Sequence, residues 1–440
     1  MKKYLSFFLL FILFPQYNFS QPKAPFWAKN ATIYEVNIRQ FTKEGTFKSF
    51  QQHLTRLKEL GVDILWLMPI NPIGELNRKG TLGSYYSIKD YVDVNPEFGT
   101  KENFKTLVDE IHNQGMYIII DWVANHTAWD NKWVKTNPEF YTKDSSGNFI
   151  PPVPDWSDVI DLNYDNKELW KEMISALEYW LNEFDIDGYR CDVAGMIPVE
   201  FWNEARFELD KMKPVFMLAE WDTPEMHKHA FDMTYDWDLH KIFNGIYLQE
   251  KNSNDIIKHI LKDLKNYPDY AYRMQFTSNH DENSWNGTEF ERLGEAAEVF
   301  AVLTYIIPGM PLIYNGQESG FNKRLEFFEK DSIIWQKNKY EKLYKNLNEL
   351  KDKNKALWTG AKRGSIDFIN NDNDILIIKR RYDENEVIGF FNLTEKEINT
   401  NIFSGKLTGT YNDFNTGESI ELNNNFQLKL NPWSYKIYFK

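Results

Sequence analysis

The sequence predicts an α/β protein built on a closed (β/α)8 barrel of the TIM type, with a short irregular insertion after the third strand and a C-terminal all-β domain. Three observations lead to this fold class. Apolar runs of strand length alternate with helical patterns, a stretch rich in proline and tryptophan follows the third run, and short β-type runs begin near Ser365. Alternation of strands and helices is typical of a parallel sheet, and eight such units indicate closure into a barrel.

The strand candidates are short apolar runs. They lie at residues 32–41, 62–68, 116–120, 186–191, 214–219, 231–235, 273–277 and 311–314. The run at 62–68 is almost continuously apolar, as expected for a strand buried on both faces. The competing fold is an open doubly wound sheet, which the lack of a glycine-rich dinucleotide motif after the first run disfavours.

Helices are predicted where apolar residues recur at intervals of three and four. This spacing covers residues 47–60, 102–113, 169–184 and 201–211. The resulting barrel domain is expected to span residues 25–360. Its insertion, residues 127–166, is expected on the side of the βα loops. Residues 365–440 carry short β-rich runs separated by turn residues and predict a C-terminal β-sandwich domain.

The N-terminus resembles a secretory signal. Lys2 and Lys3 precede an apolar run at residues 5–14, and a more polar stretch ends at Ser20. The run is too short to span a bilayer, so residues 1–20 are interpreted as a cleaved signal peptide, with an uncleaved anchor as the alternative. The protein is therefore expected to be exported, to the periplasm or the extracellular space. With Cys191 as its only cysteine, it has no internal disulfide.

Composition excludes some classes of protein. The formal net charge of −13 argues against nucleic-acid binding, which needs a basic surface. Beyond the first residues the sequence predicts no membrane span, and we expect a monomer. Aromatic residues make up 16% of the chain, which indicates either a large core or a cleft whose rings stack on sugars.

Four segments combine carboxylates with Arg, His or Asn where predicted strands end. They are Asp121 to His126, Gly188 to Asp192, Leu218 to Trp221, and Asn279 to Asp281. A single Asp after a strand is most often a helix cap. Because the carboxyl ends of barrel strands converge on one mouth, four such segments are better explained by one site.

This set of residue types suits cleavage of a glycosidic bond. One carboxylic acid protonates the leaving oxygen, while a carboxylate attacks the anomeric carbon and forms a covalent intermediate. Arg190 stands two residues before Asp192, so both side chains point the same way on a strand, and the guanidinium favours an ionised Asp192. Glu220 follows an apolar strand and precedes Trp221, a setting that favours a protonated acid.

Two histidines lie beside asparagines in these segments. His126 follows Asn125, and His280 follows Asn279. Metal ligation is one interpretation, but no His-x₃-His or cysteine partner completes a transition-metal site. We favour recognition of sugar hydroxyls by these histidines. A third interpretation is that each is an ordinary buried histidine.

Together the four segments resemble the conserved regions of the α-amylase family of glycoside hydrolases. Residues 61–69, Asp161 to Asn163 and residues 309–318 resemble further family motifs in the same order. The resemblance implies a retaining enzyme with Asp192 as nucleophile, Glu220 as general acid/base and Asp281 as stabiliser of the transition state. It also implies that Tyr86, His126, Arg190 and His280 contact the sugar at the cleaved bond; we add Trp221 as a substrate-binding candidate.

The resemblance implies a substrate class. We expect cleavage of internal α-1,4-glucosidic bonds of starch, glycogen or maltodextrins through a covalent glycosyl-enzyme intermediate. The alternative is a neopullulanase, α-glucosidase or transglycosylase acting on short α-glucans. A non-catalytic relative that only binds sugar is disfavoured because all three carboxylates are present.

Calcium is a further implication of the resemblance, and no organic cofactor is expected. Many family members bind Ca²⁺ between the barrel and the insertion, and Asn125 and Asp161 match two ligand positions. Gly195 and Met196, however, stand where many amylases have Lys and His. Met could supply the backbone carbonyl of that His, but the Lys contact to substrate is lost.

Overall fold

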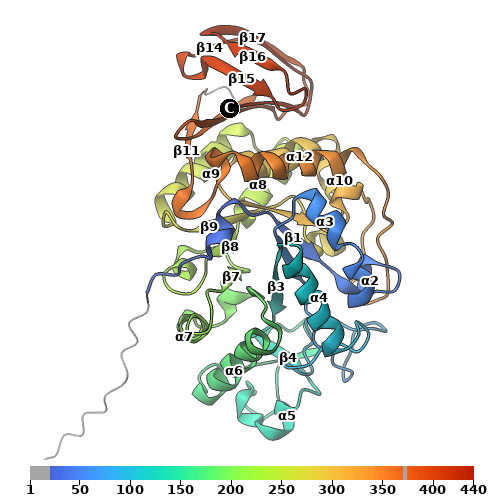
Figure 1. The fold of residues 1–440 in the computed structure, drawn as a ribbon. Helices are drawn as coiled ribbons and strands as arrows, with labels where there is room; N and C mark the ends of the chain where they lie inside the picture. The colour runs from blue at the N-terminus through green and yellow to red at the C-terminus, as the bar shows by residue number, and fades with distance from the viewer. Residues whose placement is uncertain (1–19, 370–373) are drawn as a thin grey trace, which may run out of the picture.

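The computed structural model describes residues 20–369 and 374–440, so the predicted signal peptide lies almost wholly outside the described residues. At the centre is a closed barrel of parallel strands (Figure 1). In ring order the strands are β1 (Ile33–Val36), β10 (Met310–Tyr314), β9 (Tyr272–Gln275), β8 (Met233–Tyr235), β7 (Phe216–Ala219), β6 (Gly188–Cys191), β3 (Tyr117–Trp122) and β2 (Ile64–Leu67). The predicted barrel is confirmed, and β7 lies opposite β1, four strands away in either direction.

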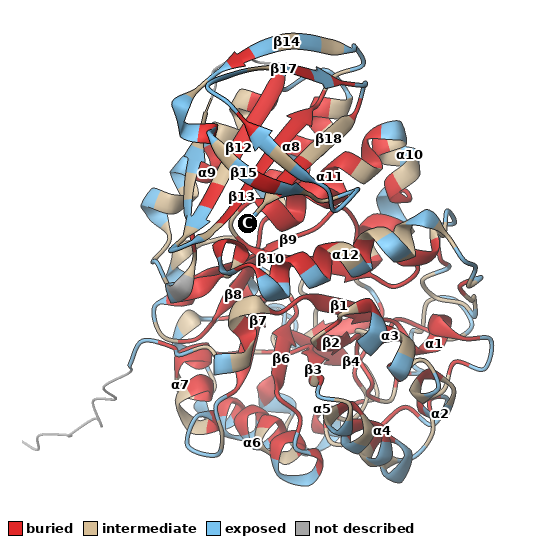
Figure 2. Cartoon of the chain, turned by 45° about the horizontal axis from the view of Figure 1, so that its top comes forward, coloured by how far each residue is buried: buried red, intermediate tan, exposed pale blue. Residues whose placement is uncertain are grey.

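Helices surround the barrel and bury one face against it. They are α1 (Ile38–Phe41), α2 (Phe47–Gln51), α3 (Leu54–Leu60), α4 (Lys101–Asn113), α6 (Lys167–Phe184), α7 (Val199–Leu209), α8 (Trp237–Tyr247), α9 (Ser253–Asn266), α10 (Glu289–Leu293), α11 (Ala297–Ile306) and α12 (Lys339–Lys353). The barrel has two cores. One fills its interior with side chains such as Trp66, Phe216 and Met274, and the other lies between strands and helices. Figure 2 shows the barrel strands as almost wholly buried.

Two predicted elements differ from the structure. The first strand ends at Val36, and residues 38–41 form the short helix α1, which begins where the backbone N–H of Asn37 donates to Oδ1 of Asn315. All these residues are buried, so hydrophobic periodicity could not separate strand from helix. The helix predicted at 47–60 is broken at residues 52–53 into α2 and α3.

The insertion stands over the carboxyl ends of the barrel strands. Its strands β4 (His126–Ala128) and β5 (Val159–Asp161) pair antiparallel, with His126 opposite Asp161. The helix α5 (Trp133–Thr136) and a 3-10 turn (Pro138–Phe140) lie between them in the chain, and most of the remainder is irregular. Strand β4 therefore fixes His126 immediately after the end of β3.

The C-terminal residues form antiparallel sheets on the far side of the barrel's last helices (Figure 1). A six-stranded sheet contains β11 (Ser365–Phe368), β12 (Ile375–Tyr382), β13 (Asn385–Asn392), β18 (Ser434–Phe439), β15 (Gly409–Asp413) and β16 (Ser419–Leu422). The second sheet pairs β14 (Ile398–Phe403) with β17 (Asn425–Leu430). Both contribute to one apolar cluster that includes Ile377, Phe390 and Leu428. Among the described residues no helix is long and apolar enough to cross a membrane.

Candidate active site

A cavity of about 730 Å³ lies at the mouth of the barrel and collects most of the predicted site residues. This volume is typical of a pocket for a small ligand. Its lining comprises Lys79, Ser84, Tyr86, His126, Asp155, Trp156, Asp158, Val159, Asp192, Val193, Glu220, His280, Asp281, Trp285, Phe327 and Phe328. Segments that follow β2, β3, β6, β7, β9 and β10 thus meet at one place.

Arg190 holds the carboxylates of the site together. It is fully buried near the end of β6, and its Nη1 donates to Oδ1 of Asp121 at 2.8 Å and to Oδ1 of Asp192 at 2.9 Å. Its Nη2 lies 2.9 Å from Oε2 of Glu220. One guanidinium therefore faces three carboxylates from three adjacent strands, and it fixes Asp192 and Glu220 close to each other.

The electrostatics separate the two catalytic candidates. Burial raises the pKa of Asp192 to about 6, although Arg190 opposes the shift. Burial likewise raises the pKa of Glu220 to about 7 against the opposing effect of Arg190, with Asp192 and Asp281 adding to the rise. The guanidinium thus favours ionised Asp192, as the sequence suggested, but burial outweighs it. Both pKa values are raised, and that of Glu220 is raised further, which suits Glu220 as the acid of the pair.

A strained backbone residue supports Glu220. Val193 follows Asp192 with φ of +36°, a left-handed conformation that is an outlier for a β-branched residue. In this conformation its backbone N–H donates to Oε2 of Glu220 at 2.8 Å. Strain of this kind costs about 1–3 kcal/mol and persists where the surrounding structure enforces it. Here it holds the Glu220 carboxyl beside Asp192.

His280 forms a second group of contacts on the opposite side of the mouth. Its Nδ1 lies 2.5 Å from Oε1 of Glu35, a buried carboxylate on β1, and its Nε2 lies 2.7 Å from the hydroxyl of Tyr86. Burial disfavours the imidazolium, but Asp281 and Glu35 outweigh it and raise the pKa of His280 to about 9. His280 is therefore a charged donor at neutral pH. Asp281 lies 3.3 Å from its Nε2 and is 35% exposed, open to the cavity.

Tyr86 presents a ring to the cavity. Its hydroxyl donates to Asp121 at 3.1 Å, and the ring stacks on Phe327 with 6.2 Å between centroids and 12° between planes. His126 is buried on β4, and burial lowers its pKa to about 4, so it is neutral. A flat ring, a neutral imidazole and a charged imidazolium suit the faces and hydroxyls of a sugar.

Trp221 lies apart from this cavity. It is 37% exposed and is not in the cavity lining, but its indole packs on Gly195. A Cβ at position 195 would lie only 1.9 Å from Cε2 of Trp221. The indole therefore occupies the space of a side chain at 195, which explains why this chain has glycine there.

The predicted calcium residues lie close together but offer few donors. The backbone N–H of Leu162 donates to the carbonyl of Asn125 at 3.1 Å, which brings Asp161 near Asn125. The Asn125 amide is also engaged with Nδ1 of His126. Ca²⁺ takes six to eight oxygen ligands. Within the described residues, Asp161 belongs to no group of three or more His, Cys, Asp or Glu side chains whose ligand atoms lie close together. These side chains alone do not fit a calcium cage.

The family is decided by comparison with known proteins. The family model of the alpha-amylase catalytic domain matches residues 26–156 and 154–388. The chain belongs to the alpha-amylase family. It is 29% identical over 466 residues to Alpha-amylase 2 of Dictyoglomus thermophilum, covering 95% of this chain and 77% of that protein.

Solved structures of the alpha-amylase family have the same fold. An alpha-amylase from Lactobacillus plantarum superposes with a TM-score of 0.84 at 31% identity, covering 93% of this chain and 99% of the other. A maltogenic alpha-amylase from Thermotoga neapolitana gives 0.84 at 32% identity, covering 93% and 98%. As a member of this family the protein is a glycoside hydrolase.

Sequence reasoning missed several residues of the alpha-amylase site. Glu35 lies in the first predicted strand, but nothing in its neighbourhood pointed to His280, far away in the chain. Trp285, four residues after Asp281, lies in a single π-helical turn (Glu282–Asn286), and Phe327 and Phe328 lie in an irregular segment; all three line the cavity. Their aromatic character was the only available signal.

Proposed function

We propose that this protein hydrolyses α-1,4-glucosidic bonds of starch, glycogen or maltodextrins with retention of configuration. The observation that carries the proposal is the shared contact of Arg190 with Asp192 and Glu220. Retaining glycosidases need a nucleophile and an acid whose carboxyl groups stand roughly 5–5.5 Å apart. Two carboxyls held by one guanidinium suit that arrangement better than the wider spacing of inverting enzymes.

The residues have complementary roles in the first step. Ionised Asp192 attacks the anomeric carbon, the bond to the glycosidic oxygen breaks, and Glu220 gives its proton to that oxygen. The product is a glycosyl ester on Asp192. Asp281 stabilises the positive charge that develops on the sugar.

In the second step Glu220 acts as a base. It takes a proton from water, whose oxygen attacks the anomeric carbon and releases the Asp192 carboxylate. Arg190 faces both carboxylates throughout and limits their repulsion. Tyr86, His126 and His280 bind the sugar on the glycone side of the bond.

Two properties of the reaction are separate from its bond chemistry: the length of the glucan that is cleaved, and the molecule, water or sugar, that accepts the glycosyl group. Among the relatives are a maltogenic alpha-amylase, a cyclomaltodextrinase and a 4-alpha-glucanotransferase. The activities that these relatives are named for include action on short α-glucans and transfer to a second sugar as well as cleavage of internal bonds. Hydrolysis and transfer share one intermediate, for which water and sugar compete.

The test uses purified wild-type, Asp192→Ala and Glu220→Gln proteins with amylose and maltotriose. We expect reducing ends from the wild type only, with both variants keeping the wild-type melting temperature within a few degrees. Full activity in either folded variant would refute the assignment. A proton-NMR time course of the first product tests retention, since an α-anomer must appear first.

We also propose that the protein is exported and acts as a monomer. The positively charged and apolar N-terminus supports export. Mass spectrometry of the N-terminus, after expression in a bacterial host, tests it: a mature chain starting near residue 21 is expected, and an intact Met1 would contradict it. Light scattering of the purified protein tests the monomer.

A further inference from the structure

One loop joins two distant parts of the cavity wall. Residues 74–82, here called the arch loop, follow β2, and Lys79 reaches from it to the insertion. The ammonium of Lys79 donates to the backbone carbonyl of Asp155 at 2.6 Å and lies 3.2 Å from Oδ1 of Asp158. Asp155 and Asp158 both line the cavity, so this bridge forms part of its wall.

The other end of the arch loop is attached to the segment after β10. The backbone N–H of Thr81 donates to Glu329 at 2.9 Å, its hydroxyl also contacts that carboxylate, and the N–H of Leu82 donates to the carbonyl of Phe328 at 3.1 Å. Gly80 has φ of +63° and packs so tightly that a Cβ there would lie 2.5 Å from Cβ of Phe328. The insertion, the arch loop and residues 327–329 therefore form one continuous arch.

Barrel topology places this arch on one side of the mouth. The arch loop and residues 327–329 follow β2 and β10, which flank β1 in the ring, and the insertion follows β3, the strand next to β2. Strand β7, which carries Glu220, lies opposite β1. Because Glu220 protonates the leaving oxygen, we place the leaving group on the β7 side of the mouth. The arch consequently stands on the glycone side.

Aromatic side chains line the cavity beside the arch. Trp285 is 52% exposed and packs on Phe327 and Phe328 with centroid distances of 5.1 and 5.8 Å. Trp156 of the insertion lines the same cavity and packs against the ring of His126. Exposed aromatic rings at a cavity rim favour contact with the apolar faces of sugar rings. The cavity wall at the arch thus combines these rings with Lys79.

We propose that the arch closes the glycone side of the cleft, so that the enzyme accepts only a few glucose units there and cleaves α-glucans from their non-reducing ends. Lys79 and Glu329 are its specificity-determining residues. This inference rests on the proposed function, because the glycone side is defined by the role of Glu220. An enzyme of this kind releases short products of nearly constant length and does not cleave internal bonds at random.

The test compares maltoheptaose glycosides whose non-reducing end is either free or blocked by a 4,6-O-benzylidene group, with products separated by chromatography. We expect the wild type to cleave the blocked substrate at least ten-fold more slowly and to release mainly one short product from the free one. Equal rates on both substrates would overturn the proposal.

Variants assign the effect to the arch. Lys79→Ala, and Lys79→Ala combined with Glu329→Ala, are expected to raise the rate on the blocked substrate several-fold relative to the free one and to lengthen the products. Lys132→Ala is the matched control, because Lys132 also links the insertion to the segment after β2, through Asp90 at 3.5 Å, but does not line the cavity. It should leave the ratio unchanged.

The outcomes distinguish the two proposals. If folded wild-type protein, verified by its melting temperature, cleaves neither substrate and releases no reducing ends from amylose, the proposed function fails. If it cleaves both at equal rates, only the arch proposal fails. If the wild type discriminates but both folded arch variants keep its ratio, the assignment to Lys79 and Glu329 is wrong.

Discussion

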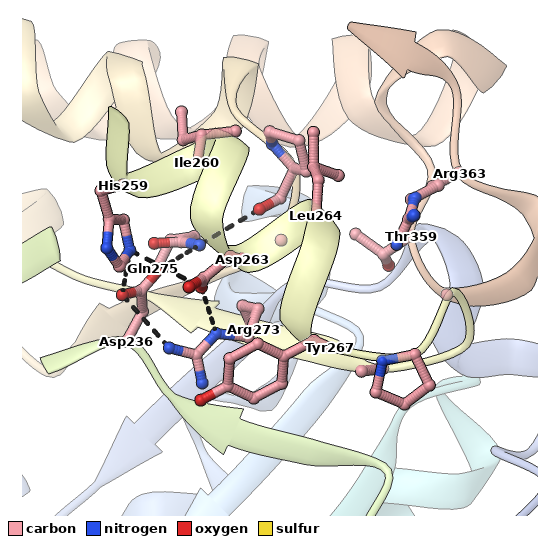
Figure 3. A pocket seen from close by; sticks show the side chains of 15 residues that line it. Asp236, His259, Ile260, Asp263, Leu264, Tyr267, Arg273, Gln275, Thr359 and Arg363 are labelled. Atoms are coloured by element: carbon pink, nitrogen blue, oxygen red, sulfur yellow. Dashed lines mark hydrogen bonds and ion pairs between the residues drawn. The ribbon is translucent and has the colours of Figure 1, made fainter. Parts of the chain in front are cut away.

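Two buried arginines of this protein have nearly the same neighbours and different uses. Arg190, at the barrel mouth, faces three carboxylates, with His280 and Tyr86 close by. Arg273, on β9, also faces three: Asp222 at 2.6 Å, Asp263 at 2.9 Å and Asp236 at 3.3 Å. His259 and Tyr267 complete this second cluster under α9 (Figure 3).

The difference lies in what remains unpaired. In the second cluster burial opposes ionisation of Asp236, but the charge of Arg273 outweighs it and lowers the pKa of Asp236 to about 2. His259, at 2.8 Å, and the amide of Gln275 add to this fall. The free space there is only about 40 Å³. In the first cluster Asp192 and Glu220 face a cavity of about 730 Å³ and have raised pKa values. The residue types of a cluster therefore do not by themselves identify an active site. Carboxylates with incomplete ion pairing beside an open cavity do.

Asp236, His259 and Asp263 also have the spacing of a metal site, with ligand atoms within 4.8 Å of one another. Arg273 already supplies the positive charge to both carboxylates. A metal ion there would have to lie against the guanidinium. The second cluster is thus complete as a structural ion network.

The largest expected effect comes from removing the charge at the first cluster. Asp192→Asn should lower kcat by about 10⁴-fold or more, because no nucleophile remains. The same change should leave the melting temperature equal or higher, since a neutral amide replaces a carboxylate that burial and neighbouring acids disfavour. Steady-state kinetics and calorimetry measure both. A marked loss of stability would mean that Asp192 is structural.

The corresponding experiment removes a carboxylate from the second cluster. Asp236→Asn should destabilise the fold by about 3–5 kcal/mol, because Arg273 and His259 lose a buried partner, while kcat changes only a few-fold. The lowered pKa of Asp236 means that its stabilising contribution is present above about pH 4 and is lost as the pH falls through about 2. Chemical denaturation at pH 7 and at pH 3 checks the variant against the wild type. A stable but inactive variant would reverse the two assignments.

The pH profile sharpens the comparison further. Catalysis needs Asp192 ionised, which requires a pH above about 6, and Glu220 protonated, which requires a pH below about 7. We expect a narrow bell-shaped kcat/KM with its maximum between these values and roughly ten-fold losses per pH unit outside them. The Asp236→Asn variant should keep both the acidic and the basic limb of this pH profile. A flat profile from pH 5 to 9 is incompatible with these two groups as base and acid.

The smallest effect is expected from chelation. Calcium at Asn125 and Asp161 remains a prediction from the sequence, and a bound ion stabilises only the folded state. With so few side-chain donors, EDTA should lower the melting temperature by at most a few degrees. An unchanged temperature, with no calcium found by elemental analysis, would remove the prediction. No step of the proposed reaction depends on the ion.

The sequence predicted what periodicity and local motifs encode. Buried strands such as 62–68 are visible because both faces are apolar, and Asp192 and Arg190 because two residues on one strand share a side. Contacts made by topology were not predictable. Glu35 reaches His280 only because β1 and β9 both border β10 in the closed ring, and Lys79 reaches Asp158 only through loops without periodicity.

The packing of Trp221 on Gly195 constrains how this site can change. With 1.9 Å between a Cβ at 195 and the indole, any larger residue at 195 clashes unless the Trp221 side chain moves away or is replaced. Contacting residues of this kind show non-additive effects. A lysine at 195 should thus be harmful alone and tolerated beside a small residue at 221. The two positions are epistatic, and the order of substitutions decides which evolutionary routes to another acceptor preference are open.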